Sequence, residues 1–173
     1  ESTSFGLRLV ETRAQLSEAV EAICDAYCQD ALVEEYIEGR EAAVALLGNQ
    51  PPEALPLVEY DFGGRSLKTV TCDDKFHKQQ DEPEKICPAP IEENLAQRIR
   101  AMALAAFRAC HCLDYARVDI RIDSAGNPFV LEINSMASLG AGGSFVRAAE
   151  AAGYSFSGLA CRILDLAHLR YFG

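Results

Sequence analysis

Two neighbouring segments in which apolar and polar side chains alternate constrain the fold of this chain most strongly. They are residues 116–123 and 128–134, and the turn-forming residues 124–127 lie between them. Because successive side chains of a strand point to opposite faces, the pattern predicts an antiparallel hairpin with one apolar and one polar face. The apolar face should carry Val118, Ile120 and Ile122 with Phe129, Leu131 and Ile133, and the polar face Arg117, Asp119 and Arg121 with Val130, Glu132 and Asn134.

The polar face of this hairpin is the candidate functional site. If the chain turns at Ala125–Gly126, Asp119 faces Glu132 with about 4.5–5.5 Å between the Cβ atoms. Two carboxylates at this distance repel each other unless a positive charge lies between them, and Mg²⁺ takes such oxygen ligands, with Asn134 as a third. A solvated polar face explains the pattern equally well. A glycosidase carboxylate pair is a weaker alternative, because the chain has no Trp to hold a sugar.

The rest of the chain predicts an α+β fold, in which a mostly antiparallel sheet is backed by helices. Apolar runs predict strands at residues 7–10, 31–37, 42–47 and 57–62, with a turn at Glu38–Gly39. Apolar spacings of three and four predict helices from a cap at Thr12 to about Cys28, and at 91–112, 144–152 and 157–169. Residues 63–90 form a long irregular stretch, which is typical of a functional lid.

Composition excludes several classes of function. The net charge of −10 argues against a nucleic-acid backbone as partner, because phosphate binding needs clustered Lys and Arg. No apolar run is long enough to span a membrane. The odd number of cysteines, seven, favours reduced thiols and a cytoplasmic protein. The chain starts at Glu1 rather than Met and an ordered pattern begins at once, so we expect it to be part of a longer protein.

Further segments extend the pattern over nearly the whole chain. Besides residues 116–119 and 131–134, they are Glu1–Gly6, Val33–Glu41, Cys87–Pro90 and Ala151–Phe156. These segments resemble parts of the D-alanine–D-alanine ligases. Residues 116–119 and 131–134 resemble the metal-binding hairpin, residues 1–6 the phosphate-covering loop, and residues 33–41 the adenosine-binding strand. Residues 87–90 and 151–156 resemble the segments before the long helix and before the last helix. The resemblance implies an ATP-grasp fold.

The resemblance also implies site residues. Asp119, Glu132 and Asn134 would hold two Mg²⁺ ions, with Mn²⁺ as an alternative. Arg117 would stabilise the charge of an acyl phosphate, and Ser144 would bind the carboxylate of the second substrate. ATP would be bound by Thr3 and Ser4 of the phosphate-covering loop, by Glu34, Tyr36, Ile37 and Leu131 around the adenine, by Glu41 at the ribose and by Lys75 at the phosphates.

Each of these residues has an alternative explanation when it is taken alone. Glu34, Glu41 and Lys75 fit ordinary surface charges. Arg117 fits an exposed ion pair with Asp119, which would contribute little to stability. Ser144 fits an ordinary helix cap.

The implied reaction joins a carboxylate to an amine in an ATP-dependent step through an acyl phosphate, with release of ADP and phosphate. Asn134 is followed by Ser135–Leu139 without the family's Pro-Gly, so another amino acid or a hydroxy acid is an alternative acceptor. A non-catalytic ATP-grasp-like module that binds or senses a nucleotide is a second alternative. The partners would be small-molecule amino acid or hydroxy acid substrates, with a homodimer as one oligomeric option.

The resemblance further implies a division of the chain. Residues 1–62 would complete the central nucleotide-binding subdomain, residues 63–90 would form the lid, and residues 91–173 would form the subdomain that binds the metal and the substrate. The family's N-terminal domain would lie outside this chain.

Overall fold

The computed structural model describes residues 6–65, 67–71 and 83–173. The chain divides into two compact units, one of residues 1–37 and 62–83 and the other of residues 38–61 and 84–173. Three residues that the resemblance assigns to ATP, Thr3, Ser4 and Lys75, lie outside the described residues.

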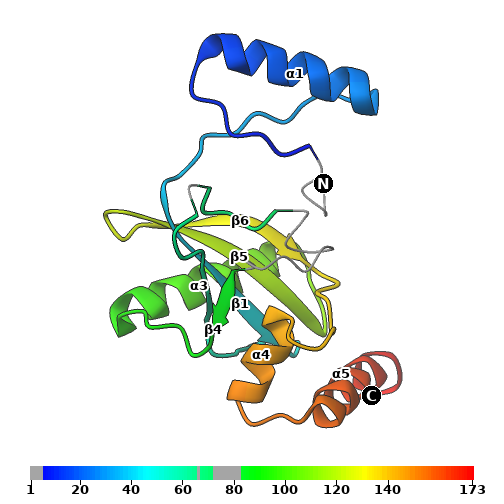
Figure 1. Cartoon of the computed structure of the whole chain (residues 1–173). Coiled ribbons are helices and arrows are strands. Elements are labelled where there is room, and N and C mark those ends of the chain that lie inside the picture. The colour runs from blue at the N-terminus through cyan, green and yellow to red at the C-terminus, as the bar shows by residue number, and fades with distance from the viewer. Residues whose placement is uncertain (1–5, 66, 72–82) are drawn as a thin grey trace. The chain divides into compact units, whose positions relative to one another are not determined.

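The first unit contains helix α1, Arg13–Tyr27, which is drawn in blue in Figure 1. It begins at the predicted cap, because the Thr12 hydroxyl accepts from the Gln15 backbone N–H at 3.2 Å. The Gln15 side chain accepts in turn from the Thr12 N–H at 3.0 Å. This reciprocal pair satisfies N–H groups that the helix start would leave without a partner. The helix ends as predicted at Cys28, whose backbone is left-handed with a φ of 51°.

Two predicted strands of the first unit are wrong. Residues 7–10 and 31–37 contain no strand. Leu32 and Val33, whose apolar character suggested the second strand, are exposed. A strand needs a neighbour that pairs its N–H and C=O groups, and a short apolar run does not supply one.

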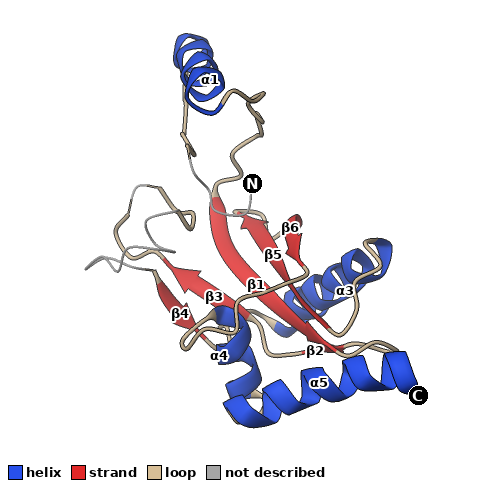
Figure 2. Ribbon diagram, turned by 90° about the vertical axis from the view of Figure 1, so that its right-hand side faces the viewer, coloured by secondary structure: helices blue, strands red, loops and turns tan. Residues whose placement is uncertain are grey.

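The second unit is built on an antiparallel sheet with the strand order β4-β3-β1-β5-β6, and the short strand β2 pairs with β1 (Figure 2). This arrangement confirms the predicted α+β fold with a mostly antiparallel sheet. Strand β4 falls inside the stretch predicted to be irregular. The bounds are β1 Gly39–Leu47, β2 Glu53–Ala54, β3 Val58–Asp61, β4 Glu84–Ile86, β5 Tyr115–Asp123 and β6 Pro128–Asn134.

Gly39 is the first residue of β1 and does not form the predicted turn with Glu38. Its φ is +153°, and a Cβ built on it would lie 1.9 Å from the carbonyl oxygen of Ile122 on β5. Only glycine allows the two backbones to approach so closely. From there β1 pairs with β5 along its whole length, and this pairing places β1 beside the hairpin.

Helix α3, Glu93–Ala109, covers one face of the sheet and confirms the predicted long helix. The main core lies between them, and each fully buried Val, Leu, Ile or Phe side chain in it contributes about 1.5–3 kcal/mol. The apolar face of β5 therefore points to α3, and its polar face is on the other side of the sheet. The core residues include Ala42, Val44, Leu46, Ile99, Ala103, Phe107, Val118, Ile120 and Ile122.

Helices α4, Ser144–Ala151, and α5, Phe156–Phe172, follow the hairpin as predicted. Phe145 of α4 meets Tyr115 of β5 edge-on, with 5.4 Å between the ring centroids. Tyr115 precedes the core residue Ala116 and so points to the opposite face. Helix α4 therefore covers the face of the sheet that carries the polar side chains.

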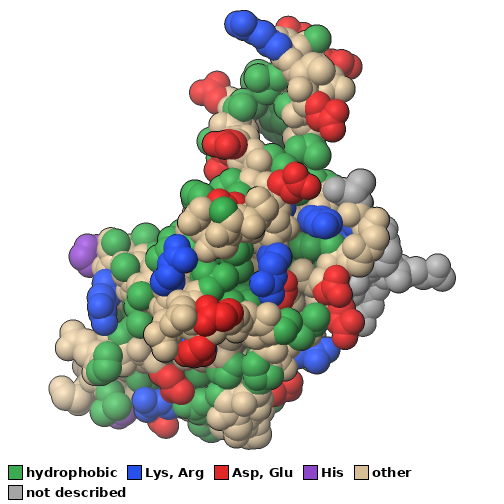
Figure 3. Space-filling view, turned by 90° about the vertical axis from the view of Figure 1, so that its left-hand side faces the viewer, with side chains coloured by type: hydrophobic (Ala, Val, Ile, Leu, Met, Phe, Trp, Pro, Cys, Tyr) green, Lys and Arg blue, Asp and Glu red, His purple; other side chains and the backbone are tan. Residues whose placement is uncertain are grey.

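The surface of the described residues mixes charges of both signs. On the face drawn in Figure 3, Lys and Arg side chains are scattered among Asp and Glu side chains. Within the described ranges, no helix has the length and apolar character that a membrane crossing requires.

Candidate functional site

The predicted pairing of the hairpin residues is confirmed at its functional end. Asp119 lies opposite Glu132, and Arg117 lies opposite Asn134. The turn is held by the Asp123 carboxylate, which accepts from the backbone N–H groups of Ala125 and Asn127 at 2.9 and 2.7 Å. These four polar side chains therefore share one face of the sheet, because directly paired residues point to the same side.

A β-bulge in the pairing of β5 with β6 changes which side chains share a face in the part of the hairpin nearer the turn. Beyond Asp119 the register shifts by one residue, so Leu131 has no partner and Ile120 lies opposite Val130. The predicted grouping of Phe129 with Ile133 is therefore wrong, since Phe129 lies opposite Arg121 on the polar side. An extra residue reverses the alternation of every residue that follows it, and the apolar pattern of the strand carries no sign of it.

Arg117 and Asp119 form a two-pronged ion pair. The Arg117 Nε and Nη2 atoms each donate to one carboxylate oxygen of Asp119 at 2.6 Å. The two side chains are only 16% and 12% exposed, so this is not the exposed surface pair of the alternative explanation. Burial lowers the pKa of Arg117, but the hydrogen bonds and the charge of Asp119 outweigh it and raise the pKa overall. Arg117 thus stays charged and relieves the repulsion between the facing carboxylates.

The three predicted metal ligands differ in how they are engaged. Asp119 is buried against Arg117, Glu132 is exposed, and Asn134 is half-buried. The Asn134 side-chain oxygen accepts from the Met136 N–H at 3.1 Å. Within the described ranges, no group of three or more His, Cys, Asp or Glu side chains is placed to hold a metal ion.

The donor set nevertheless fits magnesium. It consists of two opposed carboxylates and one amide oxygen, and each carboxylate oxygen keeps a second lone pair beside its hydrogen bond. Magnesium commonly takes only one or two protein carboxylates and fills its remaining positions with water and phosphate oxygens. An open set of three oxygens on one face is therefore sufficient, without a closed cage.

A second ion pair lies on the same face and is deeply buried. Glu41 of β1 pairs with Arg121 of β5, with 3.0 Å between Oε2 and Nη1, and the side chains are 7% and 3% exposed. The interpretation of Glu41 as an ordinary surface charge is therefore wrong. The alternation places Arg121 on this face. The sequence did not predict its ion pair with Glu41, because the two residues are 80 positions apart.

Tyr60 is a further polar residue that the sequence did not single out. It lies on β3 opposite Glu41, is 8% exposed, and lies near Ser144 of α4. Burial raises the pKa of Tyr60 to about 12, helped by the negative charges of Asp119 and Glu41, while Arg117 and Ser144 oppose the shift. Tyr60 therefore keeps its proton at neutral pH.

Ser144 is the first residue of α4 and not its cap. The cap position is Gly143, and no side chain there bonds the free N–H groups of the helix. Ser144 is 4% exposed, so its hydroxyl sits inside the fold beside the helix N-terminus. The explanation of Ser144 as an ordinary cap is wrong, and the first turn of α4 keeps donors that suit an anion.

The residues predicted to contact adenine lie in two places. Glu34, Tyr36 and Ile37 belong to the first unit, where Glu34 and Tyr36 are exposed. Leu131 belongs to the second unit and is 48% exposed at the bulge of β6.

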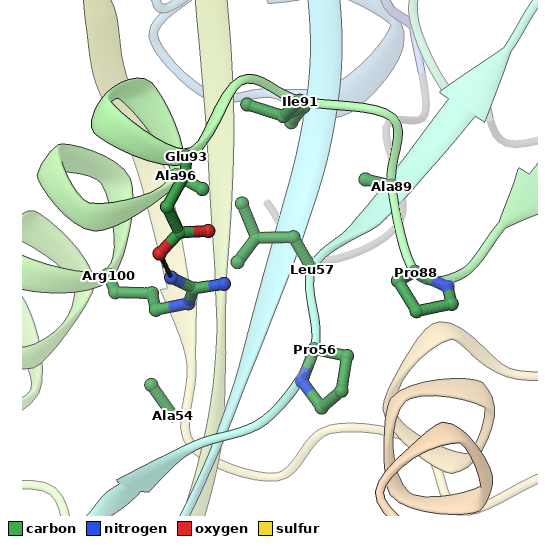
Figure 4. Close-up of a pocket in the computed structure, with 9 residues that line it drawn as sticks. All are labelled: Ala54, Pro56, Leu57, Pro88, Ala89, Ile91, Glu93, Ala96 and Arg100. Carbon is green, nitrogen blue, oxygen red and sulfur yellow. Dashed lines mark hydrogen bonds and ion pairs between the residues drawn. The ribbon is translucent and has the colours of Figure 1, made fainter.

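A separate cavity of about 440 Å³ lies on the α3 side of the sheet (Figure 4). Its walls are mostly apolar, and an ion pair between Glu93 and Arg100 at 3.0 Å lies beside it. None of the predicted site residues contributes to it. The lining residues are Ala54, Pro56, Leu57, Pro88, Ala89, Ile91, Glu93, Ala96 and Arg100.

Comparison with known proteins decides the family. The family model described as D-ala D-ala ligase C-terminus matches residues 1–165. The chain belongs to the D-alanine–D-alanine ligase C-terminal family. The predicted resemblance is thereby confirmed, and the fold is that of an ATP-grasp protein.

Individual proteins are also similar to this member of the D-alanine–D-alanine ligase family. The uncharacterized protein y4sG of Sinorhizobium fredii is 54% identical over 173 residues, which is 100% of this chain and 51% of that protein. A D-alanine–D-alanine ligase of Pelotomaculum thermopropionicum is 34% identical over 167 residues, 96% of this chain and 51% of that protein. The chain therefore spans about half the length of these curated relatives.

The fold is also shared with a solved ligase. The structure of the D-alanine–D-alanine ligase from Bacillus anthracis complexed with ATP superposes with a TM-score of 0.76 and 22% identity. The match covers 96% of this chain and 50% of that one.

Proposed function

We propose that the protein containing this chain is an ATP-dependent ligase that joins a carboxylate to an amine through an acyl phosphate and releases ADP and phosphate. The observation that supports this most directly is the polar face of the β5–β6 hairpin in a member of the D-alanine–D-alanine ligase family. Phosphoryl transfer requires oxygen ligands for a divalent metal and fixed positive charge near the reacting group. Both lie side by side here.

Asp119, Glu132 and Asn134 would hold magnesium, as two ions, or manganese in its place. The metal, when bound, would supply positive charge to the transferring phosphoryl group. The three side chains contribute oxygens from adjacent positions of two paired strands. Glu132 is exposed to solvent, whereas Asp119 is held in place by Arg117.

Arg117 would stabilise the negative charge that develops on the oxygens of the reacting carboxylate. Its guanidinium is fixed in advance by the two hydrogen bonds that it donates to Asp119, so it needs no reorganisation during the reaction. It is also largely buried, and electrostatic stabilisation is stronger where water is excluded. This role explains why an arginine lies beside the metal ligands.

ATP would be bound by the residues that the resemblance assigns to it. Glu34, Tyr36, Ile37 and Leu131 would contact the adenine, Glu41 the ribose, and Thr3, Ser4 and Lys75 the phosphates. The shared fold with the Bacillus anthracis ligase, which was solved with ATP, supports a nucleotide site in this fold. Residues 63–90 would act as the lid, residues 1–62 would complete the central nucleotide-binding subdomain, and residues 91–173 would form the metal- and substrate-binding subdomain.

Ser144 would bind the carboxylate of the second substrate together with the N-terminus of α4. The acceptor is an amino acid or, as the alternative, a hydroxy acid, because the loop after Asn134 lacks the family's Pro-Gly. The proposed location is the cytoplasm, which the odd number of cysteines in the sequence favours. A homodimer is the oligomeric state we would test first.

The reaction products test this function. Full-length protein supplied with ATP, Mg²⁺ and D-alanine should release ADP and phosphate in step with dipeptide formation. Arg117→Lys keeps the charge but loses the planar fork, so its turnover should fall by about 10²- to 10³-fold with little change in ATP affinity. Release of AMP and pyrophosphate would show an acyl adenylate and refute the mechanism.

The metal assignment has its own test. Glu132→Gln should fold normally because Glu132 is exposed, yet it should lose most activity and need more Mg²⁺ for the rest. Glu18→Gln, an exposed acid on α1, is the matched control and should behave as wild type. Calorimetric titration with Mg²⁺ and ATP separates the alternative, since nucleotide binding without turnover would identify a non-catalytic module.

A further inference from the structure

The cavity beside α3 has the size and the lining of a small-molecule site. Its volume of about 440 Å³ lies within the range of about 300–1,000 Å³ that ligand pockets usually have. Leu57 and Ala96, which line it, belong to the main core. Ala54, Ala89 and Ile91 line it as well and are only partly buried against that core. An apolar group that fills the cavity would therefore remove further apolar surface from water.

The wall of the cavity that faces α3 in Figure 4 is held in place by hydrogen bonds. The Ala89 backbone N–H donates to the Leu57 carbonyl oxygen at 2.8 Å. Arg40 of β1 donates to the Pro90 carbonyl oxygen at 3.1 Å. These bonds tie residues 88–91 to the sheet, so a ligand would have little chain to order when it binds.

The charged residues in the lining are Glu93 and Arg100, and they meet through one atom each. The Arg100 Nη1 atom donates to the Glu93 Oε1 atom at 3.0 Å, and the same oxygen accepts from Gln97 at 3.2 Å. The pair of Arg117 with Asp119, by contrast, uses two atoms of each side chain. Among the described residues, the other N–H groups of Arg100 and the Oε2 atom of Glu93 have no hydrogen-bond partner. They can therefore bind a ligand.

The two charged groups are turned toward the cavity. Figure 4 shows both side chains extending from α3 toward Leu57. The N–H groups at the start of α3 do not attract an anion, because the Glu92 carboxylate already accepts from those of Asn94 and Leu95 at 3.0 and 3.2 Å. Of the described residues that line the cavity, Arg100 is the only cation. A negatively charged ligand group would therefore bind to Arg100.

A zwitterionic amino acid complements this arrangement. Its ammonium and carboxylate groups share one carbon atom, and Glu93 and Arg100 likewise present opposite charges 3.0 Å apart. A simple carboxylate would meet Arg100 but would be repelled by Glu93, and a simple amine would be repelled by Arg100. An apolar side chain on the same molecule would fill the cavity, which has room for a large one such as that of phenylalanine.

We propose that this cavity binds an apolar amino acid, with its carboxylate on Arg100, its ammonium group on Glu93 and its side chain against Leu57 and Ala96. The cavity lies on the α3 side of the sheet, whereas α4, with the proposed acceptor site at Ser144, covers the other face. The inference does not depend on the proposed ligase function.

Ligand-observed NMR with full-length protein measures this binding, with L-phenylalanine and D-phenylalanine as the probes. For a ligand of this size we expect a dissociation constant of about 1 mM for at least one of them. Hydrocinnamate lacks the ammonium group and phenethylamine lacks the carboxylate. Each should bind about 3- to 10-fold more weakly than the amino acid.

Two variants locate the bound amino acid. Arg100→Gln removes the cation and should weaken phenylalanine binding by about 3- to 10-fold. Ala89→Leu fills the cavity and should weaken it by more than about 10-fold. Arg108→Gln is the matched control, because Arg108 is an exposed arginine of α3 outside the lining, and it should bind as wild type does.

The outcomes that overturn the inference are distinct. Absence of phenylalanine binding at about 10 mM overturns it. Hydrocinnamate or phenethylamine that binds as tightly as phenylalanine shows that the charged pair does not select an amino acid. Wild-type affinity in Arg100→Gln shows that the amino acid binds elsewhere, for example at the proposed acceptor site. Arg100 is partly exposed, so this variant decides the matter if Ala89→Leu does not fold. A protein that binds phenylalanine as expected but releases no ADP overturns the ligase function alone.

Discussion

The buried pair between Glu41 and Arg121 makes the most demanding prediction. Replacing Glu41 with Ala leaves the Arg121 guanidinium, which is 3% exposed, without its carboxylate partner. Removing one partner of a buried ion pair costs about 3–5 kcal/mol, since the remaining charge loses an opposite charge and burial keeps water from solvating it. We therefore expect Glu41→Ala to lower the free energy of unfolding by about 3–5 kcal/mol.

The neighbouring pair between Arg40 and Glu59 is the matched control. It has better geometry, with two hydrogen bonds of 2.6 Å against one ion-pair contact of 3.0 Å for Glu41. However, the Arg40 side chain is 42% exposed, so water solvates its charge when Glu59 is removed. Glu59→Ala should then cost only about 0–1 kcal/mol of the ion-pair energy. The same atoms are deleted in both variants, while the two pairs differ in their geometry and in the burial of the arginine.

The assay is urea denaturation of both variants beside the wild-type chain. The double variant Glu41→Met with Arg121→Met should recover most of the loss, because neither charge of this buried pair remains. If Glu59→Ala costs as much as Glu41→Ala, the geometry of the pair and not its burial sets the energy, and the reasoning is refuted. The result also guides functional work, since Glu41→Gln keeps the shape of the proposed ribose contact better than Ala does.

Three further predictions concern stability. Gly39→Ala should lower the free energy of unfolding, measured by urea denaturation, by about 1–3 kcal/mol, because the alanine Cβ would collide with the Ile122 carbonyl oxygen. An unchanged urea midpoint would contradict this close approach. The hydrogen bonds from Arg170 hold the pKa of Asp114 below its ordinary 3.8, so the charged form stabilises the fold. The gap in thermal midpoint between wild type and Asp114→Asn should be steady above about pH 5 and shrink as the pH falls below 3.8; a gap independent of pH would rule this out. Thr12→Ala should lower the free energy of unfolding by about 1 kcal/mol and lower the helix content measured by circular dichroism. Unchanged values would show that the capping box of α1 is dispensable.

The local elements of this protein were determined by its sequence to a large extent. The Thr12 cap and the apolar residues that follow it at spacings of three and four predicted α1. The apolar stripe of residues 91–112 predicted α3. The alternation around the 124–127 turn even predicted that Asp119 faces Glu132. All of these depend on neighbours within a few residues or across one tight turn, where spacing fixes the geometry.

Tertiary structure decided what depends on distant partners. The apolar run 31–37 forms no strand, while Gly39 belongs to a strand that pairs with β5, where the Ile122 carbonyl approaches it. The bulge at Leu131 turns Phe129 to the polar face, although alternation predicts the opposite.

In the candidate site, too, the sequence predicted some contacts and the tertiary structure decided others. The sequence placed the proposed metal ligands of the hairpin together, because they lie on two adjacent strands. It did not place Glu41 against Arg121 or Tyr60 against Ser144. Those contacts form only when the sheet brings β1 and β3 beside β5 and α4 closes over their polar face, and burial then turns ordinary polar residues into fixed charges and hydrogen bonds.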